Sequence, residues 1–283
     1  MKVSGFTFCR NVVRYDYPIV ESIRSILPIV DEFIVNVGRS EDGTLELVQS
    51  IGDPKIRIIE STWDEALRTG GLIYSQQTNI ALAACTGDWA FYLQADEVIH
   101  EDDLPRIVRA MRNHVGKLEV LGLLFRYLHF VGDYWSINPW HYHRAVRVIR
   151  NNGELESCGD AVGFCRKADG TYLQNGPSHW LASSNARVFH YGWVKNRQTM
   201  LAKRREQLKV YYGNASSEDH ARLLGQEELD LDLEHYRILK NFRGAHPKVM
   251  RSRVEKAARL APRRNRWLNW RFYREVTRRG FRG

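Results

Sequence analysis

The sequence has few cysteines and no long apolar run. No apolar stretch reaches the roughly 18 residues that a membrane-spanning helix needs. The four cysteines, Cys9, Cys85, Cys158 and Cys165, form no CxxC pair, so their spacing indicates neither a zinc site nor a disulfide framework. We therefore expect free cysteines in a reducing cytoplasm. The apolar patch at residues 3–8 is too short and too polar for a signal peptide, and it predicts a first strand.

Other absences narrow the class of protein. No GxGxxG fingerprint and no Walker loop follows a predicted strand, so neither a dinucleotide-binding fold nor a P-loop is supported. The chain has no internal repeat and no low-complexity linker. Hydrophobic residues make up 43% of the 283 residues, which is enough to bury a sizeable core and excludes disorder as the main state.

The positive charge of the chain is concentrated near its C-terminus. The net charge of +9 by itself suggests a nucleic-acid partner. However, residues 248–283 contain 13 Lys or Arg and only two Asp or Glu, which leaves residues 1–247 with a net charge of −2. Within residues 262–282, arginines alternate with aromatic residues, and Leu268, Phe272 and Val276 share one helical face. This pattern predicts either a helix that binds an anionic membrane surface or a helix docked on the domain.

The first half of the sequence alternates between strand and helix patterns. Strands are predicted at residues 3–9, 32–37, 55–60 and 89–93, and helices at 17–30, 42–51, 71–84 and 104–114. This alternation is typical of a parallel α/β sheet flanked by helices. Residues 120–131 and 145–149 predict longer strands of a mixed or antiparallel type, and 195–212 and 227–241 predict charged helices.

Polar side chains follow three of the four predicted strands, where ligands of open α/β sheets bind. Arg10 and Asn11 follow the first strand, Asn36 lies in the second, and Asp96 and Glu97 follow the fully apolar fourth strand. A carboxylate at such a strand end can hold a divalent cation against phosphate oxygens. The alternative is that Asp96 and Glu97 cap the next helix.

Four ordered motifs resemble glycosyltransferase family 2, the inverting nucleotide-sugar transferases with a GT-A fold. Arg10-Asn11 is similar to the Arg-Asn-Glu of the family, and residues 28–44 (PIVDEFIVNVGRSEDGT) are similar to its Pro-x-x-Asp-Glu-x-x-Val-x-Asp-x-Gly-Ser-x-Asp-Gly-Thr segment. Residues 79–97 (NIALAACTGDWAFYLQADE) resemble the segment that ends in Asp-x-Asp-Glu, and 188–193 (VFHYGW) resembles its distal Phe-His-Tyr-Gly element.

The resemblance implies a GT-A-type, Rossmann-like, mostly parallel sheet flanked by helices. It implies a glycosyltransferase domain over residues 1–215, with a nucleotide-binding half at about 1–115 and an acceptor half at about 116–215. Residues 216–283 would form a helical, basic C-terminal extension.

The resemblance also implies the roles of individual residues. A Mn²⁺ or Mg²⁺ ion would be held by Asp96 and His190 and would neutralise the nucleotide diphosphate. The implied donor-binding residues are Arg10, Asn11, Asn36, Asn79, Gln94, Asp96 and Glu97.

Inversion requires a carboxylate that takes a proton from the acceptor hydroxyl. Asp160, between small residues after the predicted strand 145–149, is the candidate base, and a plain turn aspartate is the alternative. Glu154 and Glu156 are weaker candidates. The aromatic stretch 134–143 suggests an acceptor subsite formed by Trp135, Trp140 and His141, with core packing as the alternative for the tryptophans.

Three positions depart from the family pattern. Asn36 and Gln94 stand where the family has aspartates, and Thr78 stands where it often has arginine. The loss of two carboxylates leaves a catalytically degenerate nucleotide- or glycan-binding protein as an alternative. A basic nucleic-acid-binding protein is a third possibility, although no recognition motif supports it.

The sequence therefore predicts a cytoplasmic glycosyltransferase, peripheral on the inner face of the membrane. It would transfer a sugar from a nucleotide-sugar donor to a glycan or lipid-linked acceptor of the cell envelope.

Overall fold

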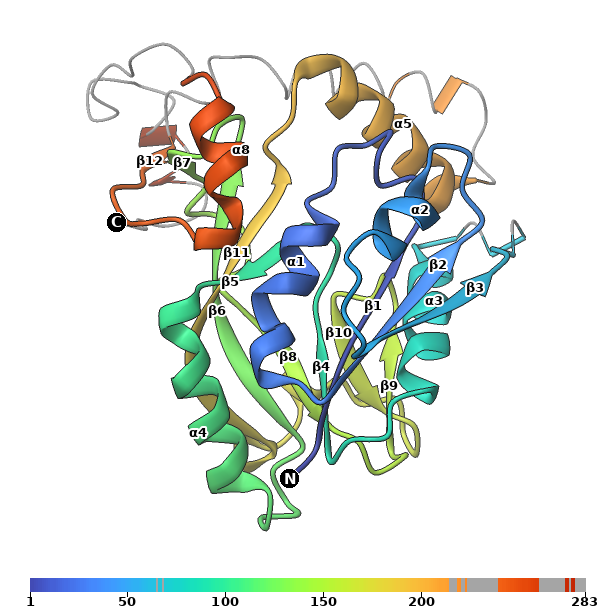
Figure 1. Cartoon of the computed structure of the whole chain (residues 1–283), viewed down its shortest axis with the longest axis vertical. Coiled ribbons are helices and arrows are strands. Elements are labelled where there is room, and N and C mark those ends of the chain that lie inside the picture. Colours follow the sequence, from blue (N-terminus) through green and yellow to red (C-terminus); the bar gives the residue numbers. More distant parts are fainter. Residues whose placement is uncertain are drawn as a thin grey trace.

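The computed structural model describes residues 1–64, 66–67, 69–213, 218–219, 222, 239–259, 273–274 and 276–277. Among these residues, ten strands form one curled sheet, and helices cover both of its faces (Figure 1). The strands are β1 (Val3–Cys9), β2 (Glu32–Gly38), β3 (Ile56–Ser61), β4 (Trp89–Tyr92), β5 (Glu97–Ile99), β6 (Gly122–Val131), β7 (Ser136–Ile137), β8 (Arg144–Arg150), β11 (Leu181–Trp193) and β12 (Lys240–Asn241). The helices are α1 (Ile19–Ile26), α2 (Thr44–Gln49), α3 (Leu72–Ala83), α4 (Leu104–His114), α5 (Arg197–Tyr212) and α8 (Arg251–Lys256).

The N-terminal half of the sheet is parallel. β1 lies between β4 and β2, and β3 is the neighbour of β2, with all three pairs parallel. All four residues of β4 are buried, which explains the unbroken apolar run at this position. The parallel α/β arrangement predicted for the first half is thus confirmed.

Alternation along β4 separates two cores. Trp89 and Phe91 point to the face covered by α1, α2 and α4, where they pack in one cluster. Ala90 and Tyr92 point to the opposite face, covered by α3 and by a separate hairpin of β9 (Leu155–Cys158) and β10 (Gly163–Arg166). Successive strand residues face opposite sides, so one short strand anchors both helical layers.

The second half of the sheet is mixed, as the sequence predicts. β8 is antiparallel to both β4 and β6, whereas the long β11 is parallel to β6 and antiparallel to β5. The register places His190 of β11 opposite both His129 of β6 and Glu97 of β5. After β11 the chain continues into α5, which crosses above the carboxyl ends of β1 and β2 (Figure 1).

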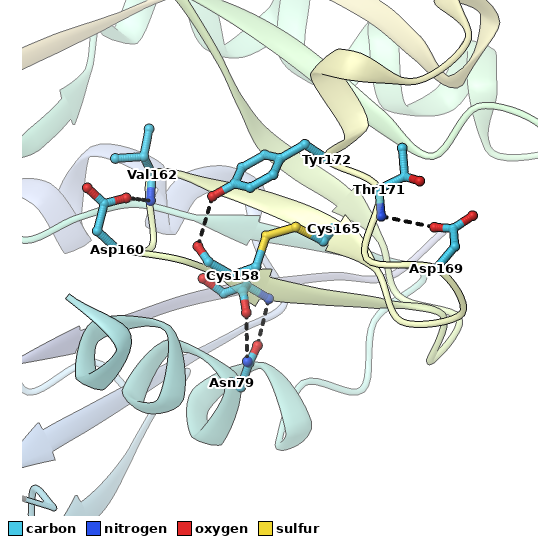
Figure 2. The surroundings of a disulfide bond; sticks show 9 residues. Asn79, Cys158, Asp160, Val162, Cys165, Asp169, Thr171 and Tyr172 are labelled. Atoms are coloured by element: carbon cyan, nitrogen blue, oxygen red, sulfur yellow. Dashed lines mark hydrogen bonds between the residues drawn. A yellow bond between two sulfur atoms is a disulfide. The ribbon is translucent and has the colours of Figure 1, made fainter. Parts of the chain in front are cut away.

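The expectation of four free cysteines is wrong for Cys158 and Cys165. These two residues form a disulfide across the hairpin of β9 and β10, with their Cα atoms 6.1 Å apart (Figure 2). Spacing alone could not predict the pair, because hairpin register and not a CxxC motif brings these residues together. Cys9 and Cys85 are free.

Two sequence predictions fall mainly outside the described residues. Of the helix predicted at 227–241, only 239–241 are described, and they include β12. Of the basic segment 262–282, only 273, 274, 276 and 277 are described. Among all described residues, no helix is long and apolar enough to cross a membrane.

Candidate active site

A pocket of about 470 Å³ lies at the carboxyl ends of β1 and β4. The loop that follows β4 and the C-terminal part of β11 form its floor, α5 forms one side, and the turn between β9 and β10 reaches into it. Seven residues predicted from the sequence line this pocket: Arg10, Asn11, Gln94, Asp96, His141, Asp160 and His190. The fold therefore brings together side chains that are up to 180 positions apart in the sequence.

Asp96 and His190 face one another on the floor of the pocket. Both are buried, and Oδ1 of Asp96 lies 3.7 Å from Nε2 of His190. The backbone fixes the pair, because the amide of Tyr191 donates to the carbonyl of Asp96 over 2.8 Å. Gly192 is required beside them, since a Cβ there would lie 2.5 Å from Oδ2 of Asp96 and 2.8 Å from Cε1 of His190.

His129 fixes the orientation of the His190 ring. Nε2 of His129 lies 2.8 Å from the carbonyl oxygen of Tyr142 and must donate to it, so Nδ1 of neutral His129 is an acceptor. Nδ1 of His190, 3.3 Å away, then carries the proton. Burial lowers the pKa of His129 to about 2 and also lowers that of His190, which keeps both rings neutral. The bare Nε2 of His190 therefore faces a carboxylate oxygen, an arrangement suited to a bound cation.

Lys203 of α5 occupies the other side of Asp96. Its buried ammonium lies 3.4 Å from Oδ2 of Asp96 and donates to the carbonyl of Gly192 over 2.9 Å. Burial lowers the pKa of Lys203, although Asp96 acts in the opposite sense. Burial opposes the ionisation of Asp96, but nearby positive charge, including the ammonium groups of Lys203 and Lys195, keeps the pKa of this carboxyl below its usual value.

Asp160 also lines the pocket, in the tight turn between β9 and β10. One carboxylate oxygen accepts from the backbone amide of Val162 at 3.3 Å (Figure 2), and the other accepts from the hydroxyl of Tyr211 at 2.9 Å. Ala161 has a positive φ of 62°, a conformation that L-residues rarely adopt and that marks a constrained turn. The side chain of Gln94 donates to the carbonyl of Ala161 over 3.2 Å. Gln94 thus connects the loop after β4 to the turn that carries Asp160.

Aromatic rings form the wall next to β1. Phe8, Trp63 and Tyr74 pack against one another with centroids 5.8–6.0 Å apart. The guanidinium of Arg10 lies 4.9 Å from the centroid of the Trp63 ring, and Asn11 adopts a positive φ of 52°. This wall offers planar surfaces and hydrogen-bonding groups side by side.

Three predicted donor-binding residues do not line the pocket. Asn36 is fully buried and donates to the backbone and side-chain oxygens of Gln77. Asn79 forms two hydrogen bonds with the backbone of Ser157, which attach α3 to β9 (Figure 2). The buried carboxylate of Glu97 forms a bidentate pair with Arg147 at 2.7 and 2.8 Å.

The two tryptophans predicted for the acceptor subsite also lie outside the pocket lining. Trp135 packs beside Tyr134, and the guanidinium of Arg259 lies 4.5 Å from its centroid. The backbone amide of Trp140 donates to Asn138 over 2.9 Å. His141 does line the pocket and stacks on Trp193, with centroids 5.9 Å apart.

Sequence reasoning missed the contribution of α5. The helix was predicted, but Lys203, Arg204 and Tyr211 were not recognised as pocket residues. The usable signal was position: α5 begins directly after the VFHYGW motif, so its residues had to lie near His190.

A second acidic group lies next to α4. His100, Glu101 and Asp102 have side-chain atoms within 4.8 Å of one another. Nδ1 of His100 accepts from the amide of Asp102, and Glu101 accepts from the amide of Lys248. These contacts identify the group as part of the turn that leads into α4.

The comparisons with known proteins concern the family and the fold. The sequence matches the profile "Glycosyl transferase family 2" over residues 15–173, more than half of the chain. No curated protein matches it.

Several solved structures show a distant likeness. Staphylococcus aureus TarS has 13% identity and a TM-score of 0.43, over 82% of this chain and 43% of that one. S. aureus TarS 1–349 in complex with UDP-GlcNAc has 12% identity and a TM-score of 0.42, over 84% and 74% of the two chains. Glucosyl-3-phosphoglycerate synthase from Mycobacterium tuberculosis, in complex with Mn²⁺, UDP-glucose and phosphoglyceric acid, has 19% identity and a TM-score of 0.32, over 45% and 44%.

These values are too low for any residue role or substrate to be transferred, and this chain spans less than half the length of full TarS. The family match covers most of the parallel sheet, Asp96 and the hairpin that carries Asp160. The chain therefore belongs to glycosyl transferase family 2, and its α/β fold is of the predicted GT-A type.

Proposed function

We propose that the protein transfers a sugar from a nucleotide-sugar donor to a glycan or lipid-linked glycan acceptor, with inversion and with the assistance of Mn²⁺ or Mg²⁺. The observation that carries this proposal is that Asp96, His190 and Asp160 line one pocket. Family membership supports glycosyl transfer from a nucleotide sugar. The acceptor, the stereochemistry and the metal are our inference.

The residues present fit a divalent cation. Oδ1 of Asp96 and Nε2 of His190 are both acceptors, and they are close enough for one ion to contact both. Such ions complete their coordination with substrate phosphate oxygens and water. When bound, the ion would neutralise the diphosphate leaving group.

The charge of the pocket supports a need for this ion. Three cationic residues, Arg10, Lys203 and Arg204, and three carboxylates, Asp96, Asp160 and Glu206, line the pocket. Their formal charges cancel, so a nucleoside diphosphate would bring negative charge that the chain alone does not offset.

Asp160 is the proposed base. Its carboxylate is held by Val162 and Tyr211 and takes the proton of the acceptor hydroxyl. The acceptor oxygen forms a bond to the anomeric carbon on the face opposite the diphosphate. The bond between that carbon and the phosphate oxygen breaks, and its electron pair leaves with the nucleotide, so the configuration inverts.

The walls of the pocket suit the nucleotide-sugar donor and the glycan acceptor. We assign the nucleoside to the aromatic wall of Phe8, Trp63 and Tyr74, with Arg10 and Asn11 as hydrogen-bonding groups. Of the predicted acceptor residues, His141 stays in the proposal, together with Trp193 on which it stacks. The basic segment 262–282 supports a further assignment, a contact with an anionic membrane that presents a lipid-linked acceptor.

Nucleotide binding and donor hydrolysis test this function. A panel of nucleoside diphosphates with and without Mn²⁺ should raise the melting temperature for at least one base, and more so with the metal. The Asp96→Ala variant should lose both this metal effect and the hydrolysis of the matching nucleotide sugar. Asp102→Ala, which removes an exposed carboxylate in the turn before α4, is the matched control and should retain both. Absence of turnover across all common donors would contradict the proposal.

A binding protein without turnover is the second candidate. Gln94 favours it, because an amide replaces the first carboxylate of the family motif and already donates to Ala161. This candidate predicts nucleotide or glycan binding by calorimetry that neither Asp96→Ala nor the removal of metal alters.

A further inference from the structure

Lys203 is the cationic residue closest to Asp96 among the described residues. Only 6% of Lys203 is exposed, and its ammonium lies between Oδ2 of Asp96 and the carbonyl oxygen of Gly192. The ring of Tyr17 adds a cation–π contact, with its centroid 4.8 Å from Nζ. A long, flexible side chain is thus fixed in one position at the floor of the pocket.

This position divides the carboxylate of Asp96 into two unequal oxygens. Oδ2 contacts Lys203 and packs against Gly192, where a Cβ would come within 2.5 Å of it. Oδ1 points toward His190. Lys203 therefore selects which oxygen of Asp96 can bind a ligand shared with His190.

The same ammonium affects cations and anions in opposite ways. An ammonium has three N–H groups, and Asp96 and the carbonyl of Gly192 accept hydrogen bonds from the ammonium of Lys203. Its charge repels a divalent cation placed between Asp96 and His190 but attracts the diphosphate of a donor. Lys203 is thus able to partner Asp96 before the donor arrives and the diphosphate afterwards.

We propose that Lys203 is a positioning residue that holds Asp96, weakens cation binding in the absence of donor and binds the donor diphosphate directly. The inference rests on the proposed function and deepens it. It predicts that the binding of metal changes the affinity for diphosphate and the reverse. The reason is that Asp96, a proposed metal ligand, and the diphosphate both interact with the ammonium of Lys203.

Calorimetry on the full chain tests this, with Mn²⁺ alone and inorganic pyrophosphate alone as probes. Lys203→Gln keeps a hydrogen-bond donor for Gly192 but removes the charge. We expect it to bind Mn²⁺ about tenfold more tightly and pyrophosphate about tenfold more weakly than the wild type. Lys203→Arg should restore both affinities toward wild type. If Lys203 had only a structural role, Lys203→Gln would weaken the affinity for both probes or for neither. Either result would overturn the inference.

Two further measurements keep the test decisive. Lys209→Gln, on the exposed side of the same helix, should change neither affinity. Wild-type protein should bind pyrophosphate without any metal, and failure to do so overturns the inference even if Lys203→Gln does not fold. If wild type binds neither probe and turns over no donor, the proposed function itself fails. If it binds both and Lys203→Gln alters neither, only the role of Lys203 fails.

Discussion

Asp160 shows how the surroundings of one residue can prepare it for proton transfer. Its carboxylate accepts from a backbone amide and from the hydroxyl of Tyr211, and Gly71 leaves room for it, because a Cβ there would lie 2.7 Å from Cβ of Asp160. Burial and Asp160 raise the pKa of Tyr211, so this hydroxyl stays protonated and remains a donor. The turn therefore presents an oriented carboxylate to the pocket.

We expect Asp160→Asn to reduce the turnover number by about 10²- to 10⁴-fold, because an amide cannot accept the proton of the acceptor. Binding of the nucleoside diphosphate should change little, since Asp160 is not among the residues proposed to hold the metal or the nucleoside. Steady-state kinetics and calorimetry measure the two effects. Asp169→Asn, in the exposed turn after β10, is the matched control. A variant that keeps more than a tenth of wild-type turnover would remove Asp160 from the role of base.

Some of these residue assignments were accessible from the sequence and others were not. The motifs indicated Asp96 and His190, and the position of Asp160 between small residues after a predicted strand made it the candidate base; all three line the pocket. A motif gives residue identity but not side-chain direction, so Asn79 and Glu97 could not be recognised as residues that contact Ser157 and Arg147. Lys203 belongs to none of the quoted motifs, and only the fold brings it to Asp96.

At the scale of elements, strands made of apolar runs were predicted well, whereas a strand with many polar residues was missed. β1 and β4 were predicted to within one residue, because both are buried on two faces. β11 was not predicted as a strand, although it spans 13 residues. Its first part contains Ser183, Ser184 and Asn185 and a register shift against β6, and these features interrupt the alternating pattern.

The hairpin of β9 and β10 supports a stability prediction. Its disulfide closes a short loop around Asp160, and a loop of this size is worth about 2–3 kcal/mol in the chain-entropy account. Replacing Cys158 and Cys165 together by serine should therefore lower the melting temperature by roughly 4–12 °C.

Reduction provides the control for this prediction. Dithiothreitol should lower the melting temperature of wild type but not of the double variant. Cys85→Ser, which alters a free cysteine, should behave as wild type in both conditions. Equal melting temperatures of wild type with and without the reductant would show that the bond does not stabilise the fold.

At the scale of the whole molecule, the sequence indicated the fold class and the mixed second half of the sheet. The spacing of apolar residues and the polar residues at strand ends were enough to predict both features, because buried parallel strands appear in a sequence as nearly continuous apolar runs. The division into a domain at 1–215 and an extension at 216–283 stays a prediction. However, α8 of the proposed extension already contacts the first part of the chain, since Arg253 pairs with Asp16 and Glu21 at 2.7 Å.

Buried neutral histidines make the stability of the whole fold depend on pH. Burial lowers the pKa of His129 to about 2 and that of His246 to about 4, whereas the unfolded chain titrates near 6.5. Below about pH 6.5 the unfolded state binds more protons, so the free energy of unfolding falls as the pH falls. For His129 the slope is up to about 1.4 kcal/mol per pH unit.

Thermal unfolding between pH 7.5 and 5 measures this effect. The melting temperature should fall toward acid, and His246→Gln should make the decline shallower. His179→Gln changes an exposed histidine and should leave the curve unchanged. A melting temperature that stays constant down to pH 5 would contradict the assignment of neutral buried rings.

The ion pair between Glu97 and Arg147 has a consequence for recombining this protein with its relatives. Glu97 belongs to the predicted nucleotide-binding half and Arg147 to the predicted acceptor half, and both side chains are fully buried. A chimera joined between the halves, near residue 115, would inherit one partner from each parent. Where the second parent lacks the matching charge, an unpaired ion would remain in the core, at a cost of about 3–5 kcal/mol. The two residues therefore have to be exchanged together, and the predicted acceptor half cannot be exchanged on its own.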